Sequence, residues 1–395
     1  MPKDIPTVLF INQHFGFLAR DLANGFSKNL GLTRVVCGNP EDVDLDESIQ
    51  IIKRTAYNRN SLGKRFISWI RFSLENYWTI GKNSGQIWIL VTNPPLIPLI
   101  LGNRAQKTNT PFFIILYDLY PDALKSIAFF KQDSLLFKLW GQWNQRIFSK
   151  ATGIITLSES MKNGLRTYLP DYPEALIQVI PNWFDKPVHA SSEPNKFQSQ
   201  YPGKKIVLYS GNIGLTHDLE TIIEAAKILK EEDNFQFVFA GEGGKKSKLM
   251  GMTNSYGLEN IDFLPYQSPQ DFQSLLEASD FAIVSTAEGI ESSSVPSKTY
   301  NALFSGLYII GISPKGSGLE ALIHEFKVGK NFLPGDVESI VLTLKELLIN
   351  PQKLSAFQVE SKKVSENFSS KNVDLYIDFI KKSLDKIEKN PKIKL

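Results

Sequence analysis

The chain has 395 residues, which favours two domains, and its 42% hydrophobic and 22% charged residues are typical of a globular protein. A net charge of +3 is too small to indicate nucleic-acid binding, and the single cysteine, Cys37, excludes an internal disulfide and fits a reducing compartment. No secretory signal is apparent, and the most apolar stretch, 87–102, is too short and too rich in proline for a membrane span. We therefore expect a cytoplasmic protein.

Short apolar runs alternate with amphipathic stretches, as in parallel sheets that helices cover on both faces. Helices are expected over 219–230, with Asp218 as N-cap, and over 269–279, while 87–102 should form a buried strand, a loop and a helix start. A polar segment with three prolines (182–205) separates two series of strands, which predicts two α/β domains. The predicted strands are 6–12, 34–37, 50–53, 87–92, 112–117, 153–157 and 177–180, then 205–210, 235–240, 261–264, 281–285 and 307–312.

Three loops after strands of the second series are rich in Gly, Ser and Lys. Each alone could be an ordinary turn, and none matches the dinucleotide fingerprint or the P-loop. Loops at the carboxyl ends of parallel strands open into one crevice, and glycines, hydroxyls and lysines there can hold a diphosphate. The loops carry Gly211 and Gly214, then Gly241, Glu242, Gly243, Gly244, Lys245 and Lys246, then Ser292, Ser293, Ser294, Pro296 and Lys298.

Loops of the first series carry a second set of candidate residues. His14, Gly16 and Arg20 follow the first strand, Asn93 follows a later one, and Asp118 stands at the end of another. We expect them to face the same cleft from the opposite side. The alternatives are a polar loop residue for His14 and a helix N-cap for Asp118.

Residues 53–82 carry seven basic residues and one acidic residue, Glu75. The basic residues indicate contact with an anionic membrane surface, while the interleaved apolar residues are expected to face the core. Those apolar residues are Phe66, Trp69, Ile70, Leu74, Tyr77 and Trp78.

Several stretches together resemble family 4 glycosyltransferases, the retaining transferases of GT-B fold, in the branch that builds bacterial capsule, O-antigen and colanic-acid-like polysaccharides. The resemblance covers most of the chain, in the family's order, and is most specific in the second domain. The stretches are YDLYPDAL, VIPNWFD, LYSGNIGLTHDLETIIEAA, FVFAGEGGKKSKL, GLENIDFLPYQ, LEASDFAIVS and VPSKTYNALFSGLYIIG.

The resemblance implies two Rossmann-like domains facing a cleft. Residues 1–185 would bind the acceptor, 186–370 would bind the nucleotide-sugar donor, and 371–395 would form a helix crossing back to the first domain, with a basic tail. The resemblance also implies that Asp118 and Lys298 serve the chemistry. The residues expected to bind the acceptor remain those of the first-domain loops, His14, Gly16, Arg20 and Asn93. The residues expected to bind the donor are Gly211, Asn212, Gly214, His217, Glu242, Gly243, Lys245, Tyr266, Ser293, Ser294, Pro296, Ser297, Lys298 and Asn301.

The chain departs from the family pattern at two places. The family's ribose-binding glutamate is replaced by Asn301, so the ribose contact would come from this amide, or from Glu288 or Glu291. The Arg and Lys of the family's first donor loop are also missing, with Asn212 and His217 near their places. Lys298 is expected to supply the lost charge.

The resemblance thus implies a retaining transferase that moves a sugar, an N-acetylhexosamine or a deoxyhexose, from a UDP-sugar to a saccharide acceptor, lipid-linked in this branch. A GDP-sugar is the alternative donor, and no cofactor or metal is expected. The competing functions are a UDP-sugar epimerase of the same fold, a hydride-transfer enzyme, which the missing fingerprint disfavours, and a non-catalytic membrane-associated relative.

Overall fold

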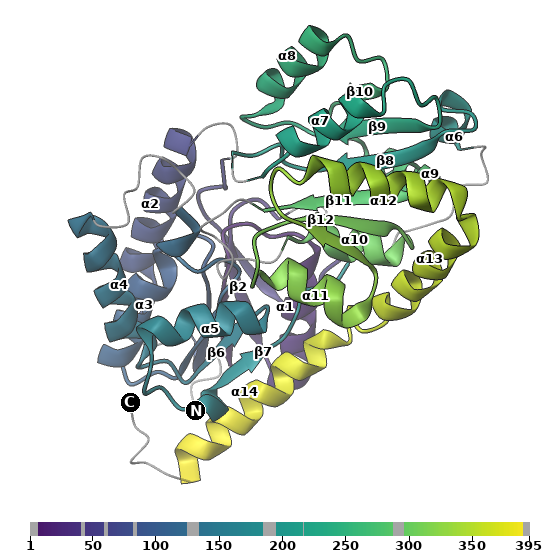
Figure 1. The fold of residues 1–395 in the computed structure, drawn as a ribbon. Helices are drawn as coiled ribbons and strands as arrows, with labels where there is room; N and C mark the ends of the chain where they lie inside the picture. The colour runs from purple at the N-terminus through teal and green to yellow at the C-terminus, as the bar shows by residue number, and fades with distance from the viewer. Residues whose placement is uncertain are drawn as a thin grey trace.

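The computed structural model describes residues 7–40, 44–58, 62–81, 85–124, 134–184, 195–215, 217–286 and 296–389. Within these residues the chain forms two parallel sheets, each covered by helices (Figure 1). No helix in the described ranges is both long and apolar enough to cross a bilayer.

The first sheet has seven described strands in the order β3-β2-β1-β4-β5-β6-β7, all paired in parallel. Its central strands are short runs of fully buried, mostly β-branched or aromatic residues, as in β4, which fits a sheet covered on both faces. The strands are β1 Val8–Ile11, β2 Thr33–Cys37, β3 Gln50–Lys53, β4 Ile87–Val91, β5 Phe112–Ile115, β6 Gly153–Thr156 and β7 Ile177–Val179. The helices are α1 Phe17–Leu30, α2 Leu62–Thr79, α3 Ile97–Lys107, α4 Leu135–Phe148 and α5 Glu159–Tyr168.

The second sheet has six described strands in the order β10-β9-β8-β11-β12-β13, again all parallel. The strand order reverses between β8 and β11, and in open α/β sheets ligands bind at this switch point. The strands are β8 Lys205–Ser210, β9 Phe235–Ala240, β10 Ile261–Leu264, β11 Phe281–Ser285, β12 Tyr308–Ile312 and β13 Gly329–Phe332. The helices are α6 Lys196–Gln200, α7 Glu220–Ile228, α8 Lys246–Tyr256, α9 Pro269–Ala278, α10 Lys298–Phe304, α11 Gly318–Phe326, α12 Val337–Ile349 and α13 Pro351–Ser365.

The last helix, α14 (Asn372–Lys389), leaves the second domain and packs on the first (Figure 1). Its Val373 lies against Gly25 of α1, and the ring of Phe379 meets that of Phe113 on β5 edge to face, with centroids 6.2 Å apart. The two-sheet GT-B architecture and the crossing helix are therefore confirmed.

The structure corrects three local predictions. Strand β13 was not predicted, because its sequence Gly-Lys-Asn-Phe lacks an apolar run. The expected core-facing orientation of the apolar residues in 53–82 is wrong for all but one of them, since only Trp69 is buried and the other five are at least 37% exposed. The N-cap of α7 is Leu219, one residue after the predicted Asp218. The Asp218 carboxylate still accepts a 3.3 Å hydrogen bond from the Thr221 amide in the first turn.

Candidate donor-binding site

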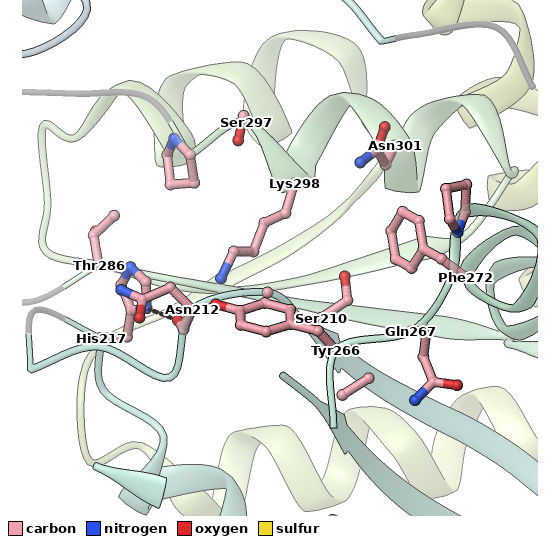
Figure 2. A pocket seen from close by; sticks show the side chains of 14 residues that line it. Ser210, Asn212, His217, Tyr266, Gln267, Phe272, Thr286, Ser297, Lys298 and Asn301 are labelled. Carbon is pink, nitrogen blue, oxygen red and sulfur yellow. Dashed lines mark hydrogen bonds between the residues drawn. The ribbon is translucent and has the colours of Figure 1, made fainter. Parts of the chain in front are cut away.

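A cavity of about 580 Å³ lies at the switch point of the second sheet (Figure 2). This volume suits a ligand of nucleotide-sugar size, since small-molecule sites span roughly 300–1,000 Å³. The lining residues come from the carboxyl ends of β8, β9 and β11, from the segment after β10, and from the start of α10. They are Ser210, Gly211, Asn212, His217, Ala240, Tyr266, Gln267, Pro269, Phe272, Thr286, Pro296, Ser297, Lys298 and Asn301.

Two glycines let the loops after β8 and β9 approach each other closely. Gly241 has a φ of +147°, and a Cβ atom at this position would lie 1.9 Å from the Gly211 carbonyl oxygen. Gly211 itself has a φ of +110°, and none of the described residues other than its chain neighbours has an atom within 4 Å of where its Cβ would be. Gly241 therefore serves loop packing, while Gly211 leaves open space beside the cavity for a ligand.

Lys298 carries the charge of this cavity. Its side chain extends from α10 toward the loop that holds Asn212 and His217 (Figure 2). The ammonium nitrogen is buried without a hydrogen-bond partner among the described residues, and lies 3.8 Å from the centre of the Tyr209 ring. Burial lowers the pKa of Lys298 from 10.5 to about 7. A buried cation whose described neighbours provide an aromatic ring but no hydrogen bond would be stabilised by an incoming anion.

Tyr209, His217 and Asn212 form a hydrogen-bonded triangle beneath this lysine. The Tyr209 hydroxyl lies 2.6 Å from the Asn212 carbonyl oxygen and 2.6 Å from Nδ1 of His217, which is 3.0 Å from the same carbonyl. Burial, and then the positive charge of Lys298, lower the pKa of His217 to about 3. His217 is therefore neutral at physiological pH. It holds the loop through hydrogen bonds and adds no second positive charge beside Lys298.

The opposite end of the cavity is aromatic and amide-rich. Figure 2 shows Phe272, Gln267 and Asn301 at this end, with Tyr266 between it and the His217 end. None of the described lining residues is an Asp or Glu, so this part of the structure offers Lys298 no counter-ion. The cavity thus combines a cationic end with a flat, partly polar end, as a nucleoside diphosphate would need.

Comparison with known proteins identifies the family of the second domain. Residues 191–364, which include all six described strands of the second sheet and the whole cavity, match the family model "Glycosyl transferases group 1". This segment belongs to the group 1 glycosyltransferases, and the chain is a glycosyltransferase.

Two curated proteins and a solved structure are similar to this glycosyltransferase. The probable glycosyltransferase WbjE of Pseudomonas aeruginosa is 24% identical over 303 residues, 73% of each chain. The putative colanic acid biosynthesis glycosyl transferase WcaI of Escherichia coli K12 is 31% identical over 206 residues, half of each chain. Anabaena Alr3699/HepE, crystallised with UDP and glucose, has a TM-score of 0.71 at 15% identity, covering 96% of this chain and all of its own. The structural likeness supports the fold alone.

The cavity of the glycosyltransferase brings together eight of the residues that the sequence predicted for donor binding. Four others do not line it, and Ser293 and Ser294 lie outside the described residues, as do Glu288 and Glu291. The eight are Gly211, Asn212, His217, Tyr266, Pro296, Ser297, Lys298 and Asn301, and the four are Gly214, Glu242, Gly243 and Lys245.

Two of the four make contacts elsewhere in the glycosyltransferase. The Lys245 ammonium donates to the His217 carbonyl at 2.7 Å and pairs with Glu220 at 3.0 Å. Glu242 pairs with Lys246 at 2.7 Å. These contacts hold the loops after β8 and β9 in place, so Lys245 and Glu242 support the cavity without lining it.

Sequence reasoning missed several residues of the site. Thr286 directly follows β11, and its hydroxyl is buried without a hydrogen-bond partner among the described residues. Its position directly after a predicted strand is the sequence signal that could have identified it as a site residue. Tyr209 gives no such signal, because in sequence it is one more apolar residue of a buried strand. The others are Ser210, Ala240, Gln267, Pro269 and Phe272.

The candidate acceptor residues gather at the switch point of the first sheet, between β1 and β4. The amide of Gln13, next to His14, donates to the Asn93 carbonyl at 2.8 Å, which joins the two loops. Gly16 is the N-cap residue of α1, and Arg20 pairs with Asp21 at 2.8 Å. The guanidinium of Arg20 is therefore already engaged.

Asp118 lies on the loop after β5, where its backbone amide donates to the Thr92 hydroxyl at 3.4 Å. Burial, and then the Asp118 charge, raise the pKa of Tyr120 well above its usual value, which places the carboxylate close to this phenol. Asp118 is not among the residues that line the donor cavity.

Proposed function

We propose that this glycosyltransferase moves a sugar from a UDP-sugar to a lipid-linked saccharide, with retention of anomeric configuration, in the cytoplasmic synthesis of a surface polysaccharide. The observation that carries the proposal is the buried Lys298 ammonium, which has no hydrogen-bond partner among the described residues, in a nucleotide-sized cavity whose described lining includes no carboxylate. An N-acetylhexosamine or a deoxyhexose is the proposed sugar.

The diphosphate is proposed to bind at the Lys298 end of the cavity. The ammonium and the free Thr286 hydroxyl are two donors without partners among the described residues, and the open space beside Gly211 allows a phosphate to approach the backbone. Charge-assisted hydrogen bonds to phosphate are about twice as strong as neutral ones.

The nucleoside is proposed to occupy the end lined by Tyr266, Gln267, Phe272 and Asn301. Asn301 takes the place of the family's ribose-binding glutamate and can both donate to and accept from ribose hydroxyls. UDP is favoured because Alr3699/HepE, of the same fold, was crystallised with UDP and glucose. A GDP-sugar is the second candidate donor, and the polysaccharide role follows from the similarity to WcaI.

The chemistry requires stabilisation of the leaving phosphate. The bond from the anomeric carbon to the β-phosphate oxygen breaks, a bond from this carbon to the acceptor oxygen forms on the same face, and the departing phosphate takes the acceptor's proton. Lys298 stabilises the negative charge that develops, so no metal is needed for this step. Asp118 is proposed to orient the acceptor hydroxyl rather than to form a covalent intermediate.

Turnover of UDP-sugars by Lys298→Ala tests this proposal, with Lys381→Ala on the exposed side of α14 as the control. We expect kcat to fall about 10²–10³-fold in Lys298→Ala, as for loss of one preorganised donor to a developing oxyanion, and to stay unchanged in the control. Lys298→Ala turnover within threefold of wild type would refute the assignment. Isomerisation of the UDP-sugar without transfer would identify an epimerase instead.

A further inference from the structure

Exposed apolar side chains concentrate on α2 and α4 of the first domain. Of the twenty large hydrophobic side chains described as exposed, ten lie on these two helices. They occupy the same spacing on both helices, residues 66, 67, 70 and 74 on α2 and 135, 136, 139 and 143 on α4, so each set forms a single stripe. We call these ten the α2–α4 face: Phe66, Ile67, Ile70, Leu74, Tyr77, Trp78, Leu135, Leu136, Leu139 and Trp143.

The opposite side of each helix already faces the core, with Trp69 and Phe72 buried on α2 and Asn144 and Phe148 buried on α4. The outer stripes are therefore additional to what folding requires. Exposed apolar side chains gathered on two helices of one domain are typical of an interaction site.

The two helices lie at the same end of the first domain (Figure 1). Both contact α3, and a row of aromatic rings joins them. Tyr120 packs between Trp69 of α2, with ring centroids 5.7 Å apart, and Trp140 of α4, stacked at 6.0 Å. Asn144 of α4 also donates to the Tyr120 carbonyl. The stripes thus belong to one rigid unit.

The charge on these helices identifies the partner. α2 and α4 carry five basic residues, and their single acidic residue, Glu75, is paired with Arg71 at 3.2 Å. Aromatic and aliphatic side chains that point outward between basic ones are typical of helices that lie in the headgroup region of an anionic bilayer. The basic residues are Lys64, Arg65, Arg71, Lys138 and Arg146.

We propose that the α2–α4 face docks the enzyme on an anionic lipid bilayer. Tyr120, which joins the two helices, is two residues from Asp118, so docking would place the candidate acceptor loop next to the lipid surface. A saccharide on a lipid carrier could then reach this loop without leaving the membrane. The access of a lipid-linked saccharide rests on the proposed function. Docking on the bilayer does not, because docking involves no turnover.

Vesicle flotation tests the proposal with the full-length protein. We expect the wild type to float with vesicles of phosphatidylcholine and phosphatidylglycerol, and to float less with phosphatidylcholine alone or in 1 M NaCl. Ile67→Glu combined with Leu136→Glu, one exposed residue from each helix, should weaken partitioning at least about tenfold. Lys138→Glu combined with Arg146→Glu should weaken it by a similar factor on the mixed vesicles only.

The control is Leu342→Glu combined with Ile349→Glu on α12, where both side chains are at least 68% exposed. These changes should leave partitioning unchanged. Absence of wild-type flotation, or equal flotation of the face and control variants, would overturn the proposal. So would a wild-type dimer in vesicle-free solution that the face variants convert to monomers, since a second copy would then cover the face.

Melting without vesicles, with and without UDP, separates this proposal from the donor site. A face variant that keeps its melting temperature and its UDP-induced shift is folded, so its loss of flotation supports docking. A wild type that binds UDP but no vesicles refutes docking alone, and one that binds vesicles but no UDP refutes the donor site alone.

Discussion

At the scale of single residues, Lys298 determines what the cavity can bind. A lysine buried without a counter-ion among the described residues is costly in the empty protein, which is why burial lowers its pKa to about 7. A diphosphate placed beside it would favour the charged form and raise this pKa again. Donor binding is therefore coupled to protonation of a single side chain.

This coupling predicts a pH-dependent donor affinity. Below pH 7 Lys298 is already charged and affinity is constant, whereas above pH 7 binding must take up a proton, so affinity falls up to about tenfold per pH unit. The other groups beside the ammonium stay neutral in this range, because the pKa of His217 is about 3 and burial raises that of Tyr209 above its usual value. Calorimetric titration with UDP-glucose from pH 6 to 8.5 measures the profile.

Lys298→Arg is the matched variant for this titration. Arginine stays charged throughout the range, so the variant should show a flat profile. A flat profile in the wild type would show that Lys298 is charged in the empty site, contrary to the prediction.

Part of this site could be predicted from sequence. Lys298 follows a predicted strand, among serines and close to a proline, which indicates an anion loop, and the family resemblance places Asn301 where the ribose-binding glutamate would stand. The partner of Lys298 could not be predicted, because Tyr209 belongs to another strand and only the sheet order brings the two together. Lys245 was misleading for the same reason, since Glu220, 25 positions away, holds it.

At the scale of elements, the donor site depends on how tightly the loops after β8 and β9 pack. Gly241→Ala would place a Cβ 1.9 Å from the Gly211 carbonyl at a φ unfavourable for alanine. We expect a loss of at least about 2 kcal/mol in the free energy of unfolding, with weaker UDP binding, measured by urea denaturation and calorimetry.

Gly251→Ala provides the matched control for this packing. Gly251 lies in α8 with no atom within 4 Å of its Cβ position, so alanine should stabilise the protein by about 0.5–1 kcal/mol. Equal stability of the two variants would show that the loops separate without cost.

The strands of both sheets were predictable because buried parallel strands read as continuous apolar runs. β13 was not predicted because it lies at the sheet edge and is largely polar. The outward orientation of Phe66 and Trp78 could not be predicted, because helical spacing shows that apolar residues share a face but not what covers that face.

At the scale of the whole molecule, helix α14 packs the C-terminal part of the chain on the first domain. It follows the second domain in sequence but packs on the first, whose buried core includes Val373, Tyr376 and Ile380 of this helix. The apolar runs do not reveal this crossing, and it was expected only from the family resemblance.

Phe379→Ala tests how much the crossing helix contributes. Phe379 is buried against Gly153 and Phe113, and its truncation should lower the free energy of unfolding by about 3–5 kcal/mol. Leu375→Ala on the exposed side of the same helix should change it by less than about 0.5 kcal/mol. Similar values for both variants in thermal or urea unfolding would mean that α14 is not packed as described.

The most direct test of the donor site is the melting temperature of the wild type and of Lys298→Ala with UDP, GDP, ADP and dTDP. A ligand that binds only the native state, present at a hundred times its dissociation constant, adds about 2.7 kcal/mol to stability. We predict a shift that is largest with UDP in the wild type and is lost in Lys298→Ala. No shift with any nucleotide, or an equal shift in Lys298→Ala, would contradict the assignment of this cavity to the donor.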